Sequence, residues 1–132
     1  MHIETSRKTI PKSQKEVYEF LTKLENFEKL MPSDTDKFEI INEDRFLFAL
    51  KGMPEIVLER KEQVEYDKIV LGAASSKLPF TLTATIFPVA EDQSEVFLGF
   101  SGEFNAMMAM MVKKPITNFM ETLSTNLGNM WA

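Results

Sequence analysis

The carboxyl-terminal segment, residues 105–131, constrains the fold more than any other part of the chain. Its apolar residues recur every three or four positions, which is the spacing of one face of an α-helix. These residues are Met108, Val112, Ile116, Phe119, Leu123 and Leu127. Such a helix would extend about 35–40 Å at about 1.5 Å per residue, slightly farther than a strand of roughly ten residues. One helix can therefore lie along a whole sheet.

A proline lies inside this helical segment. Pro115 has no amide hydrogen to donate to the carbonyl of Met111, and its ring crowds that carbonyl. We therefore expect a kink rather than a break into two helices. Asn105 is the expected N-cap, because its side chain can accept a hydrogen bond from a free amide of the first turn.

The middle of the chain, residues 37–104, has the alternating pattern of β-strands. Clusters of turn residues divide it at intervals that suit an antiparallel meander. We predict six strands, at residues 37–42, 45–51, 55–66, 68–74, 80–89 and 94–104. The helical period returns only after the last of them.

The amino-terminal part predicts one strand and two short helices. Residues 2–10 form the predicted strand, which Pro11 ends. Ser13 and Glu16 have the spacing of a capping box, so a helix should begin there and present Val17, Leu21 and Leu24 to a core. Asn26 is the expected cap of a second brief turn, which Pro32 ends because the residue before a proline avoids helical geometry.

Charge and composition exclude several classes of function. The chain has 132 residues, as expected for one domain over residues 1–132, and 20 acidic against 15 basic residues give a net charge of -5. The only Lys-Lys pair is Lys113-Lys114, so nucleic acid is not an expected partner. The amino terminus lacks the pattern of a secretory signal, and the apolar run 106–112 is far shorter than the roughly 20 residues that span a bilayer. We expect a cytoplasmic protein without membrane insertion.

The residues that usually carry metal and acyl-transfer chemistry are almost absent. There is no cysteine, and the single histidine, His2, lies at the chain end. Common zinc sites and Ser-His-Asp or Cys-His pairs are therefore not expected. The five glycines are scattered rather than gathered in a phosphate-binding loop, so we predict no cofactor, no metal and no catalytic set of residues.

The order of strand, two short helices, six strands and long helix resembles the START-like superfamily, also called SRPBCC or birch-pollen-allergen-like. Three local features carry the resemblance: Thr9-Ile10-Pro11 leading into residues 13–20, the ending Leu30-Met31-Pro32, and the proline-containing helix 107–131. The resemblance implies an α+β helix-grip fold, with a curved antiparallel sheet of about seven strands around the kinked terminal helix.

The same resemblance implies a deep pocket between the concave sheet face and the terminal helix. Across the superfamily this pocket serves lipids, sterols, polyketides and plant hormones. Some relatives are cyclases or hydrolases, and others are carriers, ligand-sensing regulators or co-chaperone modules. No motif in this sequence selects one of those branches.

Alternation in the predicted strands gives the expected ligand contacts. Strand 55–66 places Arg60 and Glu62 on its more apolar face, where they either meet a polar end of the ligand or form an ion pair at the rim. The predicted ligand-binding residues are Phe46, Phe48, Ile56, Leu58, Arg60, Glu62, Tyr66, Leu82, Ala84, Ile86, Phe100, Met108, Met111, Val112 and Phe119. The 11 phenylalanines could instead fill the interior, but Ala84, Gly99 and Gly102 leave room, and we expect an open cavity.

Three functions follow as hypotheses. The first is a carrier or sensor that binds a small apolar ligand without catalysis. The second is an enzyme of the cyclase or dehydratase type with Glu62 and Tyr66 as acid-base groups. The third is a protein-interaction module, or a homodimer, that uses the flexible side chains of Met107, Met108, Met110 and Met111, not all of which can face one core.

Overall fold

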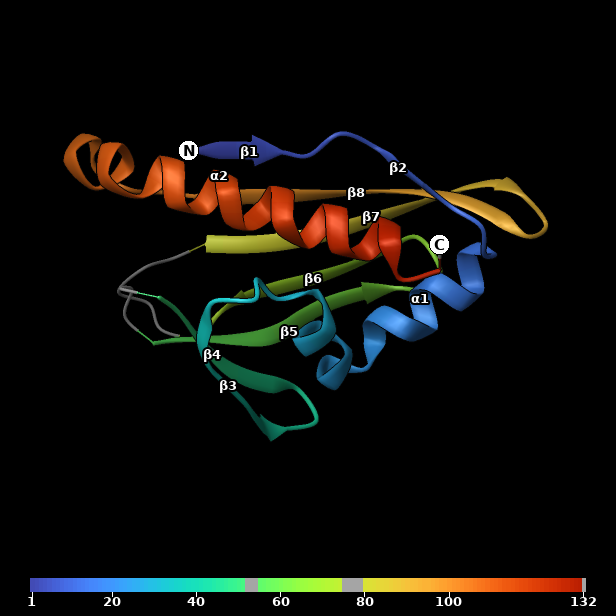
Figure 1. The fold of residues 1–132 in the computed structure, drawn as a ribbon, viewed down its shortest axis with the longest axis horizontal. Coiled ribbons are helices and arrows are strands. Elements are labelled where there is room, and N and C mark those ends of the chain that lie inside the picture. The colour runs from blue at the N-terminus through green and yellow to red at the C-terminus, as the bar shows by residue number, and fades with distance from the viewer. Residues whose placement is uncertain (52–54, 75–79, 132) are drawn as a thin grey trace.

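The fold is an eight-stranded antiparallel sheet with a long helix lying along it (Figure 1). We describe it from a computed structural model over residues 1–51, 55–74 and 80–131. The elements in chain order are β1 (His2–Glu4), β2 (Lys8–Ile10), α1 (Gln14–Thr22), the 3₁₀-helix η1 (Leu24–Leu30), β3 (Thr35–Asn42), β4 (Arg45–Leu50), β5 (Ile56–Val64), β6 (Lys68–Ala73), β7 (Phe80–Ala90), β8 (Gln93–Gly102) and α2 (Ala106–Asn129). The predicted helix-grip class is confirmed.

The sheet is a meander closed by the amino-terminal strands. Its order is β1-β8-β7-β6-β5-β4-β3, with β2 also paired to β8. We predicted one strand over residues 2–10, but Thr5 divides it. Its hydroxyl accepts a hydrogen bond from the amide of Leu98 at 2.9 Å, while its own amide donates to the Leu98 carbonyl at 2.9 Å. The side chain thus replaces a backbone acceptor, and the strand is interrupted there.

The six central strands lie within two residues of their predicted bounds. The largest differences are at the start of β3, which begins at Thr35, and at the ends of β5 and β8. Asn42, Glu43 and Asp44 separate β3 from β4 as the turn signals indicate. The predicted turns at 52–54 and 75–79 lie outside the described residues.

Two of the three predicted helix caps are present. The amide of Glu16 donates to the Ser13 hydroxyl at 3.1 Å, and the amide of Met108 donates to the Asn105 side chain at 2.8 Å. The prediction for Asn26 was wrong. Its side-chain amide donates to the Phe20 carbonyl at 2.8 Å, so it satisfies the end of α1 instead of the start of η1.

Helix α2 continues through Pro115 without a break, and the kink expected there stays a prediction. The cap at Asn105 starts it, and the Thr117 hydroxyl donates to the Lys113 carbonyl at 2.7 Å in the turn around the proline. Only the second half of α2 is firmly buried, at Phe119, Met120, Leu123, Ser124 and Leu127. Figure 1 shows this half, beside α1 and η1, lying over the sheet.

Two glycines expected to leave interior room do not. A Cβ at Gly102 would lie 2.9 Å from Cε2 of Phe104, so that space is already filled. A Cβ at Gly99 would meet nothing within 4 Å, but its neighbours Leu98 and Phe100 are buried in the core. Because successive strand residues point to opposite faces, the space beside Gly99 lies outside the concavity.

No helix among residues 1–51, 55–74 and 80–131 combines the length and apolar character needed to cross a membrane. In the same residues, no group of three or more His, Asp or Glu side chains is placed to hold a metal ion.

Candidate ligand-binding site

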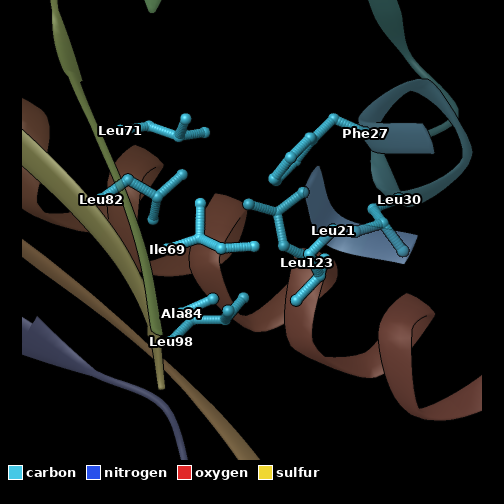
Figure 2. Close-up of a pocket in the computed structure, with 9 residues that line it drawn as sticks. All are labelled: Leu21, Phe27, Leu30, Ile69, Leu71, Leu82, Ala84, Leu98 and Leu123. Carbon is cyan, nitrogen blue, oxygen red and sulfur yellow. The ribbon is translucent and has the colours of Figure 1, made fainter. Parts of the chain in front are cut away.

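A small apolar cavity lies between the sheet and the three helices (Figure 2). Its volume, measured as the space that the centre of a water molecule can occupy, is ≈ 10 Å³. Its lining residues are Leu21, Phe27, Leu30, Ile69, Leu71, Leu82, Ala84, Leu98 and Leu123. A volume of this order holds about one water, and none of the side chains that line it can hydrogen-bond to that water. The interior here is nearly filled, in contrast to the open cavity that we expected.

Strand register builds the sheet wall of the cavity. Ala84 of β7 pairs with Ile69 of β6 on one side and with Leu98 of β8 on the other. Paired residues point to the same face, so these three side chains gather on the concave side. Ala84 is the smallest of the lining residues, and its short side chain leaves space between the branched side chains of Ile69 and Leu98.

The helices supply the opposite wall. Leu21 is on the buried stripe of α1, Phe27 and Leu30 are buried residues of η1, and Leu123 is on the buried half of α2. Figure 2 shows the Phe27 ring pointing from η1 toward the side chains of the sheet. The Asn126 side chain fixes η1 against α2, since it donates to the Leu30 carbonyl at 2.8 Å.

Stacked aromatic rings fill the interior beside the cavity. The ring centres of Phe27 and Phe46 are 5.5 Å apart, and those of Phe46 and Phe48 are 6.0 Å apart. Phe48 in turn stacks on Phe119 of α2 at 5.4 Å. In this part of the molecule the phenylalanines form a solid core, which is the alternative that the sequence left open.

The predicted ligand-binding residues lie in several environments. Leu82 and Ala84 line the cavity. Phe46, Phe48 and Phe119 belong to the aromatic stack, while Leu58, Ile86 and Phe100 are buried in the core outside the cavity lining. Ile56, Met108 and Val112 are half-buried. The structure therefore brings only two of the predicted side chains together at the cavity, and the others lie in the surrounding core, on half-buried parts of β5 and α2, or away from the concave face.

Met111 does not face the concavity. Its side chain is 69% exposed. It precedes Val112 by one position and so lies about 100° around the helix from the inward stripe.

The Arg60 guanidinium forms hydrogen bonds within the chain. Its Nε donates to Asp44 at 3.1 Å, and its Nη2 donates to the carbonyls of Thr22 and Glu43, each at 2.9 Å. These bonds join the end of α1 to the β3–β4 turn. Nη1 is buried without a hydrogen-bond partner among the described residues, but Arg60 is not among the cavity-lining residues.

Glu62 lies on the outer face, so its expected position on the same face as Arg60 was wrong. A register shift between Arg60 and Glu62 pairs Glu62 with Val70, whereas Arg60 pairs with the buried Leu71. A β-bulge of this kind adds one residue and reverses the alternation beyond it. Glu62 is largely exposed, and its carboxylate lies 3.7 Å from the ammonium group of Lys68.

Tyr66 lies in the β5–β6 turn and not on a strand. Its backbone has a φ of 69°, in the left-handed region, and its ring meets the Tyr18 ring edge-on at a centre distance of 5.5 Å. Burial raises the pKa of Tyr18 above its ordinary value of 10.0, and Glu65 adds to the effect. This phenol is therefore neutral at physiological pH.

Seven cavity residues were absent from the predicted set: Leu21, Phe27, Leu30, Ile69, Leu71, Leu98 and Leu123. Their apolar periodicity was visible in the sequence. The position of the two short helices over the sheet, which decides where the cavity lies, was not.

Comparison with known proteins identifies the fold. No family model matches the sequence, and no curated protein matches it significantly. A START superfamily protein from Mycobacterium smegmatis superposes with a TM-score of 0.74 at 12% identity, over 98% of this chain and 96% of that one. The chain adopts the START-like fold. The likeness extends to nearly the whole length of both proteins.

Two further START-like structures carry named functions. Norcoclaurine synthase from Thalictrum flavum, in complex with dopamine and hydroxybenzaldehyde, has a TM-score of 0.77 at 11% identity, over 98% of this chain and 84% of that one. The di-domain ARO/CYC protein BexL has a TM-score of 0.65 at 14% identity, over 96% of this chain and 46% of that one. Similarity at these identities establishes the START-like fold alone.

Proposed function

We propose that the chain binds one small apolar molecule between the concave sheet face and α2, as a carrier or sensor without catalysis. The observation that carries the proposal is the cavity lining, which is apolar throughout and comes from both the sheet and the helices. A preformed apolar space that cannot hydrogen-bond to water favours an apolar occupant.

A guest larger than a water must displace part of the interior, because the present space is only ≈ 10 Å³. The first half of α2 is the element best suited to move. Met108, Val112 and Ile116, on its inward stripe, are only half-buried, whereas Leu123 and Leu127 are buried. Pro115 lies between the two halves and removes one helical hydrogen bond, which lowers the cost of bending there.

The chemistry of the lining favours binding over catalysis. None of its side chains can donate or accept a proton. Of the two acid-base groups in the enzyme hypothesis, Glu62 lies on the outer face and Tyr66 in a turn, and neither lines the cavity. Shape and apolar contact would therefore hold the ligand.

The first ligands to test are small aromatic molecules. Dopamine and hydroxybenzaldehyde are bound by norcoclaurine synthase, a neighbour in fold. Phe27 offers this chain's cavity an aromatic wall. Fatty acids are the second class, since lipids are carried by relatives in the superfamily that the sequence resembles.

Native mass spectrometry of protein purified without added ligand, combined with thermal-shift screening of aromatics and fatty acids, tests the proposal. We expect a bound small molecule or a rise in melting temperature. Ala84→Val should weaken the effect, because it adds volume at the cavity wall. Thr85→Val is the matched control, since the next residue of β7 points to the other face. A protein that is purified without a bound molecule and that no compound stabilises would refute the proposal. An equal loss of ligand-induced stabilisation in Ala84→Val and Thr85→Val would refute it as well.

A further inference from the structure

The first two turns of α2 present an exposed apolar surface. Met107, Met110 and Met111 are 74%, 83% and 69% exposed, which makes them the most exposed large hydrophobic residues in the described part of the chain. Figure 1 shows this end of α2 extending past the ends of β7 and β8. We call Ala106, Met107, Met110 and Met111 the methionine end. It is apolar surface that the fold itself does not use.

Positive charge follows the methionine end directly. Lys113 and Lys114 are exposed and occupy the next turn of the helix. No acidic residue occurs between Glu103 and Glu121, although the whole chain has a net charge of -5. An acidic chain thus carries a local basic segment next to its most exposed apolar side chains. Such an arrangement complements a surface that is negatively charged outside and apolar beneath.

The spacing along the helix fits such a surface. Met107 and Lys114 are seven positions apart, which corresponds to about 10 Å along an α-helix. Apolar residues of interfacial helices enter the boundary between headgroups and acyl chains by roughly 5–10 Å. With α2 oriented along the membrane normal and Met107 at that depth, Lys114 lies about 10 Å farther out, near the level of the lipid phosphates.

We propose that the methionine end and Lys113-Lys114 dock this protein reversibly on an anionic lipid surface. Flexible, polarisable methionine side chains adapt to disordered acyl chains, and the two lysines provide the electrostatic attraction. The proposal does not depend on what the cavity binds. A second copy of the chain is the competing occupant of this surface.

Vesicle flotation of the full chain tests the proposal, with phosphatidylcholine vesicles with or without phosphatidylglycerol. We expect binding only to the anionic vesicles, and weaker binding as salt is raised. Lys113→Gln with Lys114→Gln should reduce partitioning about 30-fold, because each lysine near an anionic surface contributes about fivefold. Met110→Asp should abolish flotation.

Val89→Asp is the control for the added negative charge. Val89 is 52% exposed in the strand that leads to the β7–β8 turn, so this variant adds the same charge outside the methionine end. Its binding should equal that of the unmodified chain. Absence of flotation with anionic vesicles would overturn the proposal, and so would equal losses for Val89→Asp and Met110→Asp. A solution dimer that Met110→Asp dissociates, without vesicle binding, would assign the surface to self-association and overturn it as well.

Discussion

Replacement of Ser124 by alanine should stabilise the protein. Ser124 is on α2, is 1% exposed, and its hydroxyl has no hydrogen-bond partner in the described part of the chain. Burying a polar group without a partner costs about 1–3 kcal/mol. Alanine also has the higher helix propensity, by roughly 0.5 kcal/mol. The small void left by the oxygen offsets part of this gain, so we expect the free energy of unfolding to rise by about 1.5 kcal/mol.

This change is large enough for ordinary unfolding experiments. The entropy of unfolding of 132 residues is about 280 cal/mol/K at about 2.1 cal/mol/K per residue. A gain of about 1.5 kcal/mol then corresponds to a rise in melting temperature of about 5 °C. Urea unfolding followed by circular dichroism should show a higher midpoint with an unchanged slope.

Thr125→Ala separates the two contributions. Thr125 is the next residue of α2 but is exposed, so its replacement changes helix propensity without relieving a buried hydroxyl. Ser124→Ala should exceed it by about 1 kcal/mol. Equal effects would show that the Ser124 hydroxyl carries no burial cost, and the reasoning would be refuted.

Three further changes test other parts of the structure by the same urea unfolding. Gly99→Ala should raise the free energy of unfolding by about 0.5–1 kcal/mol, because the added Cβ meets open space. Gly102→Ala should lower the free energy of unfolding, because the Phe104 ring occupies the space that the added Cβ would need. Arg60→Met should lower it by about 2–3 kcal/mol through loss of three hydrogen bonds; an unchanged value would show that these bonds do not hold α1 to the β3–β4 turn. The hydrogen bond from Lys61 holds the pKa of Glu59 in the folded protein below its usual value of 4.5. The ionised carboxylate therefore stabilises the fold above pH 4.5, and this contribution is lost as the pH falls through the pKa of the folded state. Stability of Glu59→Gln should therefore fall less steeply with acid below about pH 4.5, and identical pH profiles would contradict this.

Periodicity predicted the elements because each element has its own repeat. The alternating segments and the helical stripe place most strand and helix bounds within two residues. Departures occurred where a side chain took a backbone role, as at Thr5 and Asn26. The β-bulge before Glu62 is a departure of a different kind, since one inserted residue moves this carboxylate to the other face without changing the apolar pattern before it.

The site was less predictable than the fold. Ala84 and Leu82 were predicted because they alternate on a strand whose face is set by its neighbours. The lining from Leu21, Phe27 and Leu30 depends on how α1 and η1 pack over the sheet, which is a tertiary property. The size of the remaining space depends on ring stacking, and residue counts alone do not determine it.

Pairing of the first strands with the last one has a consequence for synthesis on the ribosome. His2 pairs with Ser101 and Lys8 pairs with Val96, so these strands have no partner until nearly the whole sheet has been translated. Ile3 and Ile10 then remain available to chaperones or to misfolding while the chain elongates. Closure of the sheet should be a late and comparatively slow event in folding, because contacts this distant in sequence form at a high entropic cost.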